Sequence, residues 1–76
     1  MAHPQLYRIR VDNFSTRNLR TEYIFGRDKA ARLADVFLCE MQLTMSTGLV
    51  RMELYKHNQW SMFSCSRVTE GRVLEE

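Results

Sequence analysis

Cysteine and histidine are the residue types here that most readily act as nucleophiles, bases or metal ligands, and the 76-residue chain has two of each. Cys39 and Cys65 lie in apolar surroundings, and a nucleophilic thiol needs a base held beside it. His57 falls in an expected turn, His3 lies near the N-terminus, and no close ligand pair such as C-x-x-C is present. We therefore expect no metal site, and two reduced, buried thiols in a cytoplasmic protein.

The acidic residues show no pair spaced for general acid–base catalysis. Asp28 is expected to cap a helix, and Asp35 and Glu40 to lie on or near its outer face. The glycines are isolated, so a phosphate-binding loop is not indicated, and so small a chain has little room for a shielded pocket. The sequence predicts a protein that is not an enzyme and binds no cofactor.

Arginine supplies nearly all of the positive charge, and its planar guanidinium suits carboxylates and phosphates. This bias indicates a macromolecular partner, although a net charge of +2 does not predict a strongly basic nucleic-acid surface. Arginines that only solvate the surface fit the composition equally well. No apolar run approaches the roughly 20 residues that span a bilayer, and the N-terminus does not resemble a secretory signal. We expect no association with membranes.

Residues 28–45 have the three-to-four spacing of an amphipathic helix. Its expected core stripe is Ala30, Ala34, Phe37, Met41 and Met45, with Leu33 and Leu38 at the margins. Asp28 would be the N-cap residue. Residues 46–48 would end the helix, with Gly48 free to take a positive φ.

Two-residue alternation predicts strands at 6–12, 19–25, 48–56 and 60–68. The expected inward side chains are Tyr7, Ile9 and Val11 in the first strand, Leu19, Thr21, Tyr23 and Phe25 in the second, and Val50, Met52 and Leu54 in the third. Ile24 interrupts the alternation of the second strand.

The last two strands are joined at residues 57–59, and the loop length decides which side chains are buried. A two-residue loop, which we favour, points Phe63 and Cys65 inward and places Tyr55 near Trp60 on the outer face. A three-residue loop would instead bury Trp60 and Met62.

The β-β-α-β-β order predicts an α+β fold of two layers, in which one helix packs on one face of an antiparallel four-stranded sheet. A single domain is expected over 1–76, with a folded core at 6–68 and flexible segments at 1–5 and 69–76. In size and element order alone, the chain resembles small accessory proteins encoded by phages and other mobile elements. Some of these inhibit host defence complexes by binding them, so the resemblance implies a protein partner.

The helix would leave the other face of the sheet open, and five expected side chains there define a candidate binding site: Arg8, Arg10, Arg51, Tyr55 and Trp60. These residue types are typical of protein interfaces, which makes a protein the preferred partner. The alternative is an RNA- or single-stranded-DNA-binding domain that stacks bases on the aromatic rings. In a third interpretation the face is only solvated, with Arg8 or Arg10 paired to Glu22 and Arg51 paired to Glu53.

A second apolar patch, formed by Val36, Cys39 and Leu43, is expected on the outer side of the helix. An exposed apolar patch often marks an interface, so a homodimer contact is one interpretation. The other is that a loop or the C-terminal segment covers the patch, or that these are scattered surface groups.

Overall fold

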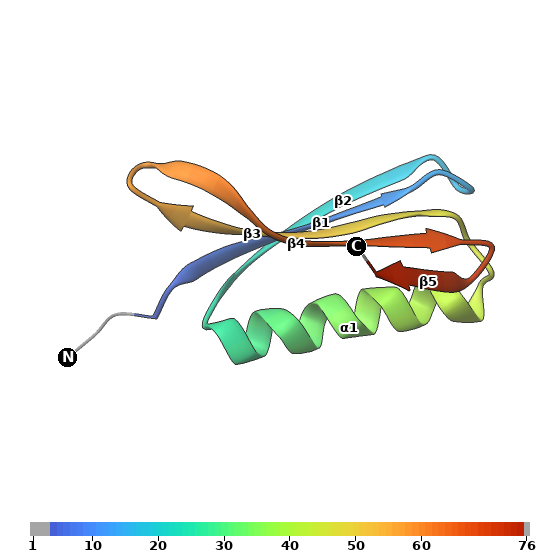
Figure 1. Ribbon diagram of the computed structural model, residues 1–76, viewed down its shortest axis with the longest axis horizontal. Coiled ribbons are helices and arrows are strands. Elements are labelled where there is room, and N and C mark those ends of the chain that lie inside the picture. Colours follow the sequence, from blue (N-terminus) through green and yellow to red (C-terminus); the bar gives the residue numbers. More distant parts are fainter. Residues whose placement is uncertain (1–3, 76) are drawn as a thin grey trace.

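The computed structural model describes residues 4–75, with one helix and five strands (Figure 1). In chain order the elements are β1 (Leu6–Asn13), β2 (Asn18–Phe25), α1 (Arg27–Leu43), β3 (Gly48–Lys56), β4 (Gln59–Thr69) and β5 (Arg72–Glu75). The strands form one antiparallel sheet in the order β2-β1-β3-β4-β5, and α1 packs on one face. Residues 1–3, including His3, and residue 76 lie outside the described residues.

The two-layer α+β class is confirmed, but the sheet has five strands rather than the predicted four. The additional strand, β5, follows a two-residue turn in which Glu70 and Gly71 have φ angles of 47° and 78°. Glycine tolerates this left-handed geometry, and the Gly71 N–H donates a hydrogen bond of 3.0 Å to the Ser46 carbonyl. Val73 pairs with the fully buried Val68 and packs against the core. Segment 72–75 thus joins the sheet.

The hydrophobic core lies between α1 and the central strands, as the alternation in the sequence predicts. Its buried members are Tyr7, Ile9, Val11, Ala30, Ala34, Phe37, Met41, Val50, Met52 and Val68. Leu33, Leu38 and Leu54 are partly buried against it. The predicted core face is therefore confirmed for β1, for β3 and for most of α1.

Both predicted ends of the helix need correction. Gly26 is the N-cap residue and no side chain of residues 4–75 caps the helix, so Asp28 contributes only an acidic group to the first turn. At the other end, Met45 has a left-handed φ of 52°, and its N–H bonds to the Gln42 carbonyl. The N–H of Ser46 reaches back to the Met41 carbonyl at 2.9 Å, which completes a Schellman motif. This reversal leaves Met45 70% exposed, outside the core stripe.

Gly48 does not take a positive φ as predicted, but begins β3 as a buried residue. A Cβ atom at this position would overlap the backbone carbonyl of Asp12 and lie 2.8 Å from Cε of Met41. Glycine is needed here because the neighbouring strand and the helix approach so closely.

The predicted core face of β2 is wrong. Tyr7 pairs with Ile24 and Ile9 with Glu22, so Ile24 is the residue of β2 that packs on the core. The other side of the strand, with Leu19, Tyr23 and Phe25, is exposed. The helix lies mainly beneath β1 and β3, so burial selects the face of this edge strand only weakly.

The β3–β4 hairpin has the favoured two-residue loop, in which His57 and Asn58 have φ angles of 52° and 59°. Between the Met52–Ser64 and Glu53–Met62 pairs, a β-bulge leaves Phe63 without a partner. Phe63 turns toward the helix side, with its ring centroid 5.7 Å from that of Tyr7.

The prediction that Cys65 points inward is wrong. The bulge shifts the register by one residue, so Cys65 pairs with Arg51 and lies on the open face.

Candidate functional site

All five side chains of the candidate site lie on the sheet face opposite α1, called here the open face. Arg8 and Arg10 come from β1, Arg51 and Tyr55 from β3, and Trp60 from β4. The register brings them together, because Arg10 pairs with Arg51 and Tyr55 pairs with Trp60. Alternation along each strand turns these side chains away from the core residues between them.

Trp60 is the centre of an aromatic and cationic group, the Trp60 cluster, made of Arg8, Tyr23, Tyr55 and Trp60. The Trp60 ring centroid is 5.1 Å from that of Tyr55 and 5.8 Å from that of Tyr23. The guanidinium carbon of Arg8 lies 4.3 Å from the Trp60 ring centroid, a cation–π contact. The cluster thus joins four strands, β1 to β4.

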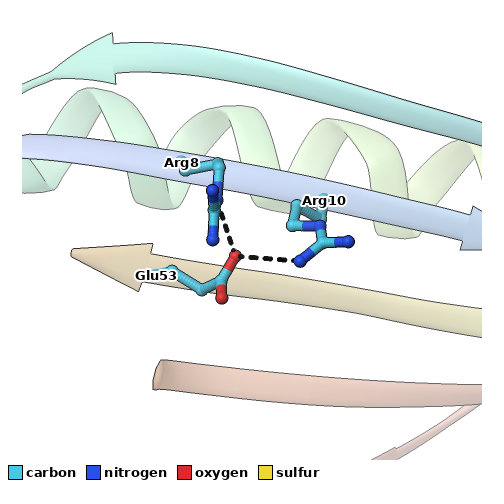
Figure 2. A network of polar contacts seen from close by, with 3 residues as sticks. All are labelled: Arg8, Arg10 and Glu53. Carbon is cyan, nitrogen blue, oxygen red and sulfur yellow. Dashed lines mark hydrogen bonds and ion pairs between the residues drawn. The ribbon is translucent and has the colours of Figure 1, made fainter. Parts of the chain in front are cut away.

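Glu53 holds the arginines of this face in position (Figure 2). Its Oε1 accepts a hydrogen bond of 2.9 Å from Nε of Arg8 and lies 4.0 Å from Nη1 of Arg10. Glu53 is only 8% exposed. The hydrogen bond from Arg8 lowers the pKa of Glu53, with help from the charges of Arg8, Arg10 and Arg51, although burial opposes the shift. The same hydrogen bond raises the pKa of Arg8.

The ion pairs predicted for a merely solvated face are not the ones formed. Glu53 pairs with Arg8 across β1 and β3, whereas Glu22 lies on the helix side of β2 and pairs with Arg20 at 3.1 Å. Nε of Arg51 is buried and has no hydrogen-bond partner among residues 4–75. The Nε–H of Arg51 is therefore a donor that the described residues leave unused.

Five exposed apolar side chains on the open face lie outside the predicted site: Leu19, Tyr23, Phe25, Met62 and Leu74. The sequence predicts Leu19, Tyr23 and Phe25 in the core because β2 carries apolar residues on both faces. The outward position of Met62 follows directly from the two-residue hairpin loop and could have been predicted.

The helix patch of Val36, Cys39 and Leu43 is exposed in the described part of the chain. Val36 is 54% and Leu43 79% exposed, so neither a loop nor β5 covers them. The expectation that Cys39 is buried is wrong, since it lies on the outer side of α1, while Cys65 is half-buried. Both thiols are free.

A cavity of about 240 Å³ lies beneath the β1–β2 hairpin, with Arg20, Glu40, Phe37 and Thr44 in its lining. None of the five candidate side chains contributes to it. No group of three or more histidine, cysteine, aspartate or glutamate side chains within 4–75 is placed to hold a metal ion. The helix found in that range is too short or too polar to cross a membrane.

Fold and site together define the class: a two-layer α+β domain with an open sheet face rich in arginine and aromatic residues. No protein-family model matches the chain, and neither a curated protein nor a solved structure matches it.

Proposed function

We propose that this protein is a non-enzymatic binding module whose open sheet face binds a surface on another protein. The observation that carries the proposal is the Trp60 cluster: aromatic rings and arginine on one face, ordered by Glu53. Tryptophan, tyrosine and arginine are the residues that most often dominate the energetics of protein interfaces. Because Glu53 already holds Arg8, binding would immobilise few additional side-chain rotamers.

The exposed surroundings of the cluster support an apolar contact. Tyr23 is 61% and Met62 56% exposed, and both lie on the same face as Trp60. Arg10 and Arg51, paired across β1 and β3, add positive charge beside this apolar surface. The complementary partner surface would present apolar side chains next to one or more carboxylates.

Nucleic-acid binding is less well supported by the same geometry. A base that stacks on a protein ring needs a free ring face, whereas the guanidinium of Arg8 lies over Trp60 at 4.3 Å. Glu53 also places a carboxylate among the arginines that would have to contact phosphates. These two contacts favour a protein as the partner.

The test is site-specific photo-crosslinking in cells of the native host, with the crosslinker at Met62 on the open face and, as the matched control, at Leu43 on the helix. We expect a protein that crosslinks from position 62 and not from position 43. With that protein purified, Tyr23→Ala and Met62→Ala should each weaken binding about tenfold, and Leu43→Ala should leave it unchanged.

Trp60 is the only tryptophan, so its fluorescence reports on the open face directly. Saturable quenching by single-stranded RNA or DNA, with affinity that falls steeply as salt rises, would contradict a protein partner and establish the alternative. The proposal also fails if the partner's affinity is unaffected by both Tyr23→Ala and Met62→Ala.

A further inference from the structure

β2 is an edge strand that lacks several of the usual protections against pairing with another chain. It has eight residues, pairs with β1 without interruption, and contains no proline or lysine. The opposite edge, β5, has only four residues. Natural proteins protect sheet edges with short strands, bulges, proline or charged side chains, and of these β2 has only the charged Arg20 and Glu22.

The outward backbone groups of β2 can be assigned from one hydrogen bond at its end. The Gly26 N–H donates to the Gln5 carbonyl at 2.8 Å, so this N–H points toward β1, and the Phe25 carbonyl in the same trans peptide points away from it. In an antiparallel strand this direction alternates from residue to residue. The N–H and C=O groups of Leu19, Thr21, Tyr23 and Phe25 therefore point outward. No backbone hydrogen bond from residues 4–75 reaches them.

We propose that the occupant of this edge is a second copy of the same chain, paired antiparallel through β2 about a two-fold axis at Thr21. In this register Arg20 of each copy lies opposite Glu22 of the other, on the helix side of the sheet. Leu19 lies opposite Tyr23 of the other copy on the open face, and the two Thr21 residues lie opposite one another. In this register opposite charges face one another across the two strands, and apolar side chains face apolar side chains.

Neighbouring registers with the same faces aligned are disfavoured by charge. An axis at Arg20 would place two arginines directly opposite one another, and an axis at Glu22 would do the same with two glutamates. Like charges in directly opposed positions destabilise a strand pair. Within one chain, Arg20 and Glu22 already approach to 3.1 Å, which shows that both side chains can reach along this surface.

The dimer would extend the five-stranded sheet of each copy into one continuous sheet with both helices on the same side. The two open faces would adjoin across the axis. Leu19, Tyr23 and Phe25, all exposed in one chain, would then form an apolar strip shared by both copies.

The test is sedimentation equilibrium over a concentration series. Thr21→Pro removes an outward N–H without removing a bond to β1, so it should weaken dimerisation at least about 100-fold in a folded protein. Glu22→Arg should weaken it about tenfold, and the charge swap Arg20→Glu with Glu22→Arg should restore it to about the wild-type value. Circular dichroism establishes that each variant is folded.

Several outcomes would overturn the edge-pairing dimer. One is a monomer at every concentration up to about 1 mM. Another is a dimer that Leu43→Asp abolishes and Thr21→Pro does not, which would assign self-association to the helix patch. If Thr21→Pro fails to fold, the charge variants provide the test. A dimer dissociation constant that Glu22→Arg leaves unchanged would reject the register centred on Thr21. The proposal would also fail if the chain stayed monomeric and β2 paired with a strand of an unrelated protein.

Discussion

At the scale of single residues, Glu53 orders the polar part of the open face, because one buried carboxylate interacts with both Arg8 and Arg10. Its folded-state pKa lies below the ordinary 4.5, so ionised Glu53 stabilises the folded state at neutral pH. This stabilisation is complete above the pKa of the unfolded chain. It is lost as the pH falls through the lower, folded-state pKa.

Glu53→Gln should therefore lower the free energy of unfolding by about 1–3 kcal/mol at neutral pH, since the partly buried Arg8 loses its charged acceptor. The difference between wild type and variant should narrow as the pH falls below 4.5. Urea denaturation at several pH values measures both effects. Glu22→Gln, measured at a protein concentration too low for the proposed dimer, is the matched control: its ion pair with Arg20 is exposed, and the change should stay within about 0.5 kcal/mol. A pH-independent difference for Glu53→Gln would contradict this account.

At the scale of elements, the C-terminal end of α1 places a residue with a side chain, Met45, in a backbone conformation that favours glycine. Met45 occupies the left-handed position of a Schellman motif that usually holds glycine, and its side chain is largely exposed. A Cβ atom in this conformation costs about 1 kcal/mol, and little buried apolar surface offsets that cost. Met45→Gly should therefore raise the free energy of unfolding by about 0.5–1 kcal/mol. Thermal or urea unfolding measures this change. Leu43→Gly is the control: it places glycine inside the helix and should lower the free energy of unfolding. Destabilisation by Met45→Gly would mean that the Met45 side chain contributes packing.

The elements also show why some predictions succeed and others fail. The faces of β1 and β3 could be predicted because their apolar residues alternate cleanly and both strands pack against the helix. The face of β2 could not, because Tyr23 and Ile24 are adjacent and the edge position buries neither fully. The bulge at Phe63 has no local sequence signal, so the predicted face of Cys65 is wrong. The last strand, β5, does have a local sequence signal, because Glu70-Gly71 between Val68 and Val73 is a two-residue turn pattern.

At the scale of the whole molecule, the fold class follows from the order of the patterns, but the function depends on how distant segments meet. Arg8 and Glu53 are 45 residues apart in sequence, and the ion pair between them requires β1 to lie beside β3. The Trp60 cluster likewise needs β2 and β4 to approach across the intervening strands. Periodicity alone indicates which face a side chain takes, not which strands are neighbours. The sequence therefore predicts which side chains lie on the open face, but not which of them contact one another.

The strand order also predicts how stability is distributed. β1 and β3 have partners on both sides and pack against the helix, whereas β5 is a four-residue edge strand. In native-state hydrogen exchange at low protein concentration, the β1 and β3 amides should exchange only through global unfolding. Their exchange free energy should equal that from urea denaturation. The amides that join β5 to β4 should exchange at a lower free energy.

Val73→Ala tests whether β5 opens independently, because Val73 packs this strand against the core. The substitution should lower protection in β5 by about 1 kcal/mol, as expected for lost apolar burial, with a smaller effect on β1. Equal protection of β5 and β1 in the wild type, with equal losses in the variant, would mean that the sheet opens as one unit. In that case Val68, which β5 helps to cover, would be part of the cooperative core rather than its margin.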